Sequence, residues 1–187
     1  MTRIVAGRLG GRRIVAPPGE RTRPTSDRVR EALFSSLETM TDLAGARFAD
    51  LYAGSGAVGL EAYSRGAAQV LLVESDARSA RIIRENLAAL RAAPAARLVA
   101  AKVAQVLSTA PEGGPYDIVF ADPPYDVPDR EVTSVLAALA DGGWLADRAV
   151  VVVERATRSG PVTWVDDITE ERSRRYGETT LWYGRRS

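Results

Sequence analysis

The sequence of 187 residues has no cysteine and no histidine, and Lys102 is its only lysine. Without cysteine there is no disulfide framework and no thiolate metal site, which fits a reducing cytoplasm. Without histidine there is neither a Ser-His-Asp triad nor a histidine-ligated zinc. Any catalytic group must therefore be a carboxylate, a hydroxyl, a guanidinium or a backbone group, and we expect no metal site.

Long apolar runs are absent as well. No run approaches the roughly 18 residues needed to cross a bilayer. Arg8, Arg12 and Arg13 interrupt the N-terminal stretch where a signal peptide would be apolar. We therefore expect a cytoplasmic protein with no membrane partner. The length, with 45% hydrophobic and 26% charged residues, is ordinary for one globular domain.

Positive charge is concentrated at the N-terminus. Residues 1–30 hold eight arginines against Glu20 and Asp27, a net charge of +6, so the other residues carry −5 of the total of +1. A basic arm on an acidic body favours a polyanionic partner, because contacts between cations and phosphates dominate such binding. The alternative is a solvated surface segment.

Short strand-like runs at 3–6 and 12–16 flank a glycine-containing stretch and predict a small β-hairpin that ends at Pro17-Pro18. We expect residues 1–20 to form this hairpin extension and residues 21–187 to form the main domain. Apolar residues from Val29 to Met40 recur at helical spacing, with Ser26 or Asp27 as the N-cap.

From residue 46 onward, strand and helix patterns alternate. Strands are expected at 47–52, 70–74, 97–101, 116–121 and 150–153, and helices at 57–64, 80–90, 103–107 and 132–139. The alternation predicts an α/β fold in which helices cover a parallel sheet. The runs at 162–168 and 179–183 have no helix between them, so we expect an antiparallel pair at one sheet edge.

A strand, a glycine turn and a helix follow one another at 48–59. Gly54, Gly56 and Gly59 match G-x-G-x-x-G, and Glu74 follows Gly54 by twenty residues. That acid is placed to accept hydrogen bonds from ribose hydroxyls, so a dinucleotide such as NAD is one possible ligand.

Three features favour S-adenosylmethionine over NAD. Asp50 places a carboxylate beside the glycine loop, where it would repel pyrophosphate and attract a cationic methionine group. The antiparallel C-terminal pair resembles that of methyltransferases, and a dehydrogenase usually needs His, Cys or Lys. The expected cofactor-binding residues are Asp50, Tyr52, Gly54, Ser55, Gly56, Glu74, Ser75, Lys102, Val103 and Asp122. Asp76 is either a ligand or a helix N-cap. Residues 101–103 stand where such enzymes often carry an acid that meets the adenine amino group, so either backbone groups recognise the adenine or Lys102 is simply solvated.

The apolar strand at 116–121 runs into Asp122-Pro123-Pro124-Tyr125. A base's amino nitrogen shares its lone pair with the ring and is a poor nucleophile. Hydrogen bonds from it to the Asp122 carboxylate and the Pro123 carbonyl would aim it at a methyl donor and stabilise developing positive charge. Tyr125 can stack on a base that is unpaired or flipped. Asp122, Pro123 and Tyr125 are the expected catalytic residues.

The chain resembles the RsmD family, the bacterial 16S rRNA guanine(966)-N2 methyltransferases, over essentially its whole length. The motifs that carry the resemblance are Ile4-Val5-Ala6-Gly7-Arg8, Gly11-Arg12-Arg13-Ile14, Thr22-Arg23-Pro24-Thr25-Ser26-Asp27-Arg28, Asp50-Leu51-Tyr52-Ala53-Gly54-Ser55-Gly56, Asp122-Pro123-Pro124-Tyr125 and Tyr176-Gly177-Glu178-Thr179.

The resemblance implies a Rossmann-like class I S-adenosylmethionine-dependent methyltransferase. Its sheet would have seven mostly parallel strands with an antiparallel C-terminal strand, plus the N-terminal β-hairpin. It further implies a cytoplasmic monomer that modifies one guanine of 16S rRNA in small ribosomal subunit assembly intermediates. The RNA-binding residues would be Arg3, Arg8, Arg12, Arg13, Arg23, Thr25 and Arg28. The alternatives are a DNA adenine-N6 or other nucleic-acid amino-methyltransferase, a non-catalytic RNA-binding assembly factor and a NAD oxidoreductase.

Overall fold

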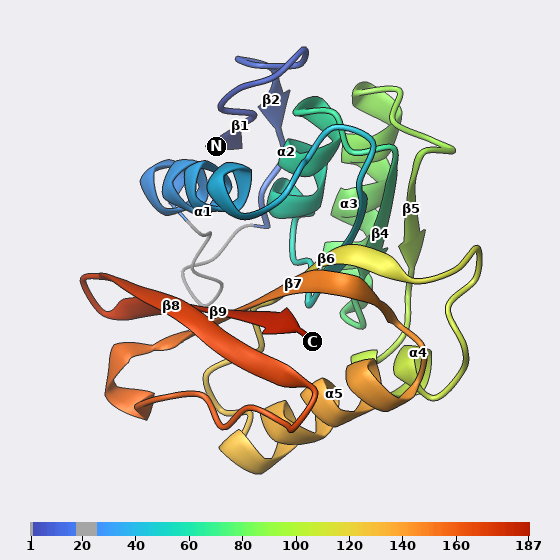
Figure 1. Ribbon diagram of the computed structural model, residues 1–187. Helices are drawn as coiled ribbons and strands as arrows, with labels where there is room; N and C mark the ends of the chain where they lie inside the picture. The colour runs from blue at the N-terminus through green and yellow to red at the C-terminus, as the bar shows by residue number, and fades with distance from the viewer. Residues whose placement is uncertain (1, 18–25) are drawn as a thin grey trace.

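The computed structural model describes residues 2–17 and 26–187 (Figure 1). Its main sheet has the strand order β5-β4-β3-β6-β7-β9-β8. Pairing is parallel from β5 across to β7, and β9 is antiparallel to both of its neighbours. The strands are β3 (Arg47–Leu51), β4 (Gln69–Val73), β5 (Ala96–Val99), β6 (Tyr116–Ala121), β7 (Leu145–Ala156), β8 (Ile168–Tyr176) and β9 (Thr179–Arg186). The sheet that we predicted is thereby confirmed.

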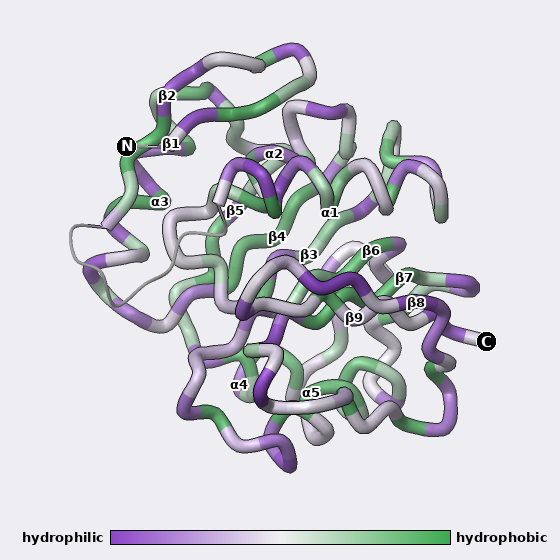
Figure 2. Tube along the Cα trace, turned by 90° about the vertical axis from the view of Figure 1, so that its left-hand side faces the viewer, coloured by the Kyte–Doolittle hydropathy of each residue, from purple (hydrophilic) through white to green (hydrophobic). Residues whose placement is uncertain are grey.

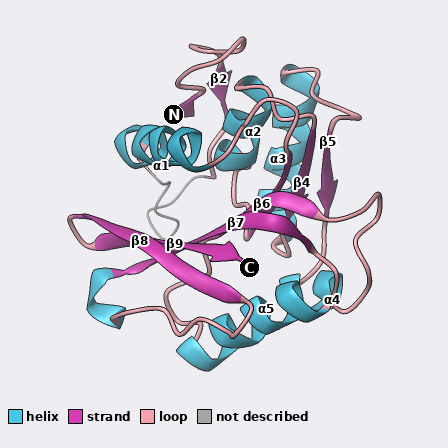
Figure 3. Ribbon diagram, viewed as in Figure 1, coloured by secondary structure: helices cyan, strands magenta, loops and turns pink. Residues whose placement is uncertain are grey.

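Helices cover both faces of this sheet, as Figure 3 shows. One layer holds α1 (Asp27–Met40), α2 (Ala57–Ser64) and α3 (Ala77–Ala89). The other holds α4 (Val103–Leu107) and α5 (Asp129–Asp141), and a single 3-10 turn, η1 (Thr157–Ser159), follows β7. Ser26 caps α1 by accepting the N–H of Val29, one of the two caps that we proposed. Each helix of the described part is too short or too polar to cross a bilayer.

Alternate side chains along each inner strand belong to two different apolar cores, one on each face of the sheet. In β6, Ile118 and Phe120 belong to the core under α1–α3, whereas Val119 and Ala121 belong to the core under α4 and α5. A strand buried on both faces reads as a continuous apolar run, because neither face meets water. Figure 2 shows apolar colouring along inner strands of the sheet such as β4.

The N-terminal hairpin consists of β1 (Thr2–Arg3) and β2 (Arg13–Ile14), which pair antiparallel over two residues each. Its strands are therefore shorter than the runs that predicted them. Ile4 and Ile14 are buried and belong to the core under α1–α3. The division of the chain at residue 20 stays a prediction.

A buried carboxylate in α2 holds this hairpin in place. Glu61 accepts the N–H groups of Val5 at 2.8 Å and Ala6 at 3.0 Å. The same carboxylate pairs with Arg30 of α1 at 3.3 Å and with Arg65 at 2.9 Å. Arg30 and Glu61 are fully buried, so this arginine of the basic segment serves the fold. Pairing is what makes two buried charges tolerable.

The structure contradicts one of the expected strands. Residues 161–165 form no strand, and β8 instead occupies Ile168–Tyr176, most of which we had assigned to a connection. Strand β8 lies at the sheet edge and exposes charged residues such as Glu170 and Arg174. Edge strands commonly carry charges that discourage further pairing, and here those charges hid the strand from an apolar pattern.

Replacing Glu61 with alanine should lower the free energy of unfolding by about 3–5 kcal/mol, because Arg30 would lose its fully buried carboxylate partner. Chemical denaturation measures the loss. The control is Glu38→Ala: Glu38 is about half exposed and pairs with Arg65 at 3.3 Å, and such surface pairs contribute about 0–1 kcal/mol. Equal losses in the two variants would contradict a structural role for Glu61.

Candidate active site

The sheet reverses its strand order between β3 and β6. From β3 the chain runs through α2 to β4 and through α3 to β5, and it then returns through α4 to β6 on the other side of β3. Ligands of open α/β sheets bind at such a switch point, beyond the carboxyl ends of the strands. The glycine loop follows β3 and the Asp-Pro-Pro-Tyr segment follows β6, so the fold brings the two motifs together.

The glycines of the loop serve two different geometrical needs. Gly54 and Gly56 have φ values of +60° and +84°, and Gly56 is the N-cap of α2. Such left-handed conformations cost a side chain energy that glycine avoids. A Cβ atom on Gly59 would lie 2.4 Å from Cδ2 of Leu72. Gly59 therefore lets α2 pack closely on the sheet.

Asp50 is buried at the end of β3, and its Oδ2 accepts the N–H of Gly59 at 2.9 Å. Burial raises the pKa of Asp50 well above its ordinary value, and the nearby Glu74 and Glu154 raise it further. The hydrogen bond from Gly59 opposes this rise only in part. A cation placed beside Asp50 would restore its ionised form.

The side chain of Glu74 stabilises the glycine loop by accepting hydrogen bonds from backbone N–H groups. Its Oε1 accepts the N–H of Gly54 at 2.7 Å and its Oε2 accepts the N–H of Asp76 at 2.8 Å. Each carboxylate oxygen has a second lone pair, so acceptor capacity for a ligand's hydroxyls remains. Asp76 is the N-cap of α3, accepting the N–H of Ser79 at 2.9 Å, and this hydrogen bond lowers its pKa. The capping interpretation of Asp76 is thereby confirmed.

Asp122 lies at the end of β6, where its N–H donates to the carbonyl of Leu51 at 3.4 Å. Burial raises the pKa of Asp122 well above its ordinary value, and the charges of Glu154 and Asp50 add to the rise. Pro123 is buried. Tyr125 is 47% exposed and is therefore available to stack on an incoming ring.

Two residues of this site were missed from the sequence, and both follow the apolar run 150–153. Glu154 is buried beside Asp122 and hydrogen-bonds it. Buried Arg155 donates from Nη2 to the carbonyl of Val127 at 2.8 Å and to Asp129 at 3.2 Å. It thus fixes the segment after the Asp-Pro-Pro-Tyr motif. Both residues could have been found from the sequence, because polar residues at the carboxyl end of a parallel strand face the ligand site.

Four more of the expected cofactor residues differ in their exposure. Tyr52 has a left-handed φ of +62° and packs against the core under α4 and α5. Burial, with the charge of Glu131, raises its pKa to about 12. Lys102 is exposed at the N-cap of α4 and Val103 is buried. Ser75 is exposed. Direct contact of these residues with a cofactor stays a prediction.

A buried amide that the sequence analysis missed connects the hairpin to the glycine loop. Asn86 of α3 donates from Nδ2 to the carbonyls of Val15 at 2.9 Å and Ser55 at 3.0 Å. Its Oδ1 accepts the N–H of Val15 at 2.8 Å. A polar residue on the buried face of an amphipathic helix is the signal for such a bond, because a buried amide needs partners.

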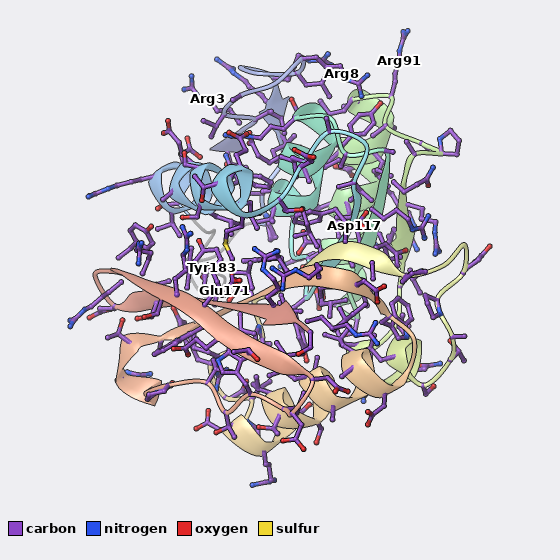
Figure 4. All side chains as sticks on the ribbon, in the orientation of Figure 1. Arg3, Arg8, Arg91, Asp117, Glu171 and Tyr183 are labelled. Carbon is purple, nitrogen blue, oxygen red and sulfur yellow. The ribbon has the colours of Figure 1, made fainter. Side chains whose placement is uncertain are left out.

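Five of the expected RNA-binding residues are exposed, and two lie outside the described residues. The exposed ones are Arg3, Arg8, Arg12, Arg13 and Arg28; Arg23 and Thr25 belong to the undescribed range. Arg8 donates its N–H to the carbonyl of Ser64, at the end of α2 away from the glycine loop. Because α2 has eight residues, its two ends are about 12 Å apart. Figure 4 shows Arg3 and Arg8 on the hairpin side of the molecule.

Comparison with known proteins agrees with this architecture. The family model described as Conserved hypothetical protein 95 matches residues 2–185. The chain belongs to this family. The Ribosomal RNA small subunit methyltransferase D of Escherichia coli (strain K12) is 42% identical over 166 residues, which are 87% of this chain and 80% of that relative. Its namesake from Haemophilus influenzae is 34% identical over 81% of this chain and 77% of its own length.

Solved structures extend the likeness to the fold. The structure named "Putative methyltransferase yhhF from Escherichia coli" superposes with a TM-score of 0.86 at 35% identity, covering 99% of this chain and 97% of that one. Magnesium protoporphyrin IX methyltransferase from Synechocystis PCC 6803 reaches a TM-score of 0.66 at 17% identity, over 86% of this chain and 79% of its own. The fold of this RsmD-family chain is thus the Rossmann-like methyltransferase fold.

The raised pKa values of Asp50 and Asp122 make stability depend on pH. The folded chain binds these protons more tightly than the unfolded chain, so the two groups stabilise it below their ordinary pKa of 3.8. That contribution is lost as pH rises through the raised values. The variant Asp122→Asn cannot ionise, and it should be more stable than the wild type at about pH 8 by roughly 1 kcal/mol or more. Urea unfolding across the pH range measures the difference.

The difference should shrink towards low pH, where Asp122 of the wild type is protonated. Asp76→Asn is the control of opposite sign, because the pKa of Asp76 is lowered. Its contribution is present at neutral pH and is lost as pH falls. A constant difference between Asp122→Asn and the wild type at every pH would contradict the raised pKa.

Proposed function

We propose that this protein transfers the methyl group of S-adenosylmethionine to the exocyclic N2 of a guanine in 16S rRNA, at position 966. The observation that carries the proposal is the half-buried Asp122, next to Pro123 and beside the buried carboxylates Asp50 and Glu154, at the switch point of a methyltransferase fold. The names of the 42% and 34% identical relatives support an rRNA substrate.

The residues present fit this cofactor. Asp50 and Asp122 have raised pKa values, and a cationic ligand beside them would relieve the repulsion that raises those values. Glu74 is held at the glycine loop with acceptor capacity for ribose hydroxyls. S-adenosylmethionine would supply an electrophilic methyl group on a positively charged sulfur. Asp50 and Glu74 bind, and neither reacts.

The protein's task in the reaction is to orient a weak nucleophile. The carboxyl group of Asp122 and the carbonyl of Pro123 accept the two N–H bonds of the guanine amino group and so direct its lone pair. The same two acceptors stabilise the positive charge that develops on nitrogen. Pro123 and Pro124 have no N–H groups, and their rings restrict the backbone that carries these acceptors. The methylated nitrogen loses its proton readily, so no histidine is needed.

The proposed substrate is a maturing small ribosomal subunit, met in the cytoplasm by a monomer. The exposed arginines of the hairpin and Arg28 would bind phosphates around the target. Arg23 and Thr25 belong to the same proposed surface. Asn86, which bonds both Val15 and Ser55, would link this arm to the cofactor loop.

Three other functions would explain parts of the site. A DNA adenine-N6 methyltransferase would use the same Asp122 chemistry, and a non-catalytic RNA-binding assembly factor would use the basic hairpin alone. A NAD oxidoreductase would use the glycine loop. The cluster of Asp50, Asp122 and Glu154 favours a cationic cofactor over pyrophosphate, because carboxylates repel phosphate.

Product analysis separates these functions. The purified protein, with labelled S-adenosylmethionine and small subunits from a strain lacking the endogenous enzyme, should label 16S rRNA. Nuclease digestion should yield N2-methylguanosine. DNA and mature subunits serve as comparison substrates. Label in adenine would overturn the guanine proposal, and cofactor binding without any transfer would favour an assembly factor.

Substitution of Asp122 tests the roles within the site. Asp122→Ala should abolish transfer, because the amino group loses an acceptor, while calorimetry shows nearly unchanged cofactor binding through Asp50 and Glu74. Asp122→Asn keeps a carbonyl acceptor and should keep part of the activity. If Asp122→Ala instead lost the cofactor, Asp122 would be needed mainly for cofactor binding, and its proposed role in orienting the amino group would be wrong.

A further inference from the structure

A pocket of about 280 Å³ opens beside Tyr125, at the end of the sheet where β7 finishes. None of its residues belongs to the cofactor site. Its lining comes from three segments that are distant in sequence: Tyr125, the stretch Ala156 to Arg158, and Arg175 with Glu178 on either side of the β8–β9 turn. The last two flank Tyr176-Gly177, a motif that the proposed function leaves without a role.

The floor of the pocket is a rigid part of the sheet. Ala156 pairs with Thr179 across β7 and β9. The N–H of Thr157 donates to the carbonyl of Glu178 at 2.7 Å, and the hydroxyl groups of Thr157 and Thr180 are 2.8 Å apart. The β8–β9 turn is therefore bonded directly to the end of β7, which fixes this side of the pocket.

The rim of the pocket carries two exposed guanidinium groups. Arg158 belongs to η1, and Arg175 is near the end of β8. Nε of Arg175 donates to the carbonyl of Gly177 at 3.0 Å, which restrains its planar group. Guanidinium groups bind phosphate through paired N–H donors. Glu178 lies on the same wall, and because a carboxylate repels phosphate, an anion would be confined to the arginine side.

We propose that this pocket binds the sugar–phosphate backbone of the target nucleotide, with its phosphate on Arg158 and Arg175. The inference rests on the proposed function, since it takes the base to be flipped onto Tyr125. The Watson–Crick edge of that base faces Asp122, so its sugar and phosphate lie on the opposite side, towards solvent. The exposed ring of Tyr125 borders both the Asp122 segment and the pocket, which makes the two subsites continuous.

Arg8 of the hairpin does not take this role, because it is bonded to Ser64 at the distal end of α2, about 12 Å of helix away from the glycine loop. The hairpin arginines would bind flanking RNA. A phosphate contact next to Tyr125 instead stabilises the flipped state itself and offsets the cost of unstacking, which is a few kcal/mol.

Arg158→Gln, Arg175→Gln and the double variant test the pocket. Arg148→Gln is the matched control, because Arg148 is an exposed arginine of the same strand region, eight residues before Ala156 and roughly 26 Å along β7. Each single variant should raise KM for small-subunit RNA about 5- to 10-fold and leave KM for S-adenosylmethionine within about 2-fold. The slope of log affinity against log salt should fall by about 0.7–0.9 for each lost phosphate contact.

RNA affinity is also measured without cofactor, by fluorescence anisotropy with a 16S fragment that contains the target guanine. The pocket variants should bind more weakly than Arg148→Gln, with the reduced salt slope. Affinities and slopes equal to those of the control would overturn the proposal even in a fully active enzyme. If the wild type binds the fragment in this way but methylates no RNA, the proposed function fails while the phosphate contact stands.

Discussion

The close contact between α2 and the sheet positions both functional ends of the molecule. Gly59 lets the helix approach Leu72, and the N–H of Gly59 then reaches the carboxyl group of Asp50. On another side of the same short helix, Glu61 holds the backbone of the hairpin together with Arg30 and Arg65. A shift of α2 would therefore disturb the carboxylate site and the hairpin together.

The carboxylates at the ends of β3, β6 and β7 destabilise the protein when no ligand is bound. Asp50 and Glu154 are buried, Asp122 is half-buried, and the three carboxylates repel one another, so desolvation and repulsion keep the pKa values of the two aspartates high. Arg155 opposes the rise at Asp122 but also bonds to Val127 and Asp129. A site of this kind gains stability when a cation binds, so its electrostatic strain is matched to its proposed ligand.

Most of the fold could be predicted because its signals are local. The glycine loop, the apolar strand before Asp122 and the helix that Ser26 caps each depend on neighbouring residues, and each is present where we expected it. The prediction of a strand at 162–168 was wrong. Charged residues interrupt the apolar pattern of β8, so only its pairing with β9 identifies it as a strand. Sequence periodicity carries no information about such an edge strand.

From the sequence, a site residue could be predicted only where it lies at the end of an expected strand. Asp50 and Glu74 lie near the ends of expected strands and Asp122 follows one, so their grouping came from a rule about parallel sheets. Glu154 was missed because the strand before it was predicted to end at residue 153, whereas β7 continues to Ala156. Asn86 contacts Val15, which is 71 residues away in the chain, and no local pattern indicates that partner.

Under the proposed function, the positions of the basic residues constrain how RNA would bind. Arg8 of the hairpin lies at the distal end of α2, whereas Arg158 and Arg175 border the pocket next to Tyr125. Contacts that hold the phosphates next to a base can offset the cost of taking that base out of its stack. A phosphate contact at one place only adds affinity but does not favour flipping, because the whole RNA can move together with the base. An anchor on the hairpin and a second one beside Tyr125 restrain the backbone at two points, so the extrusion of one base becomes the favourable way to occupy both.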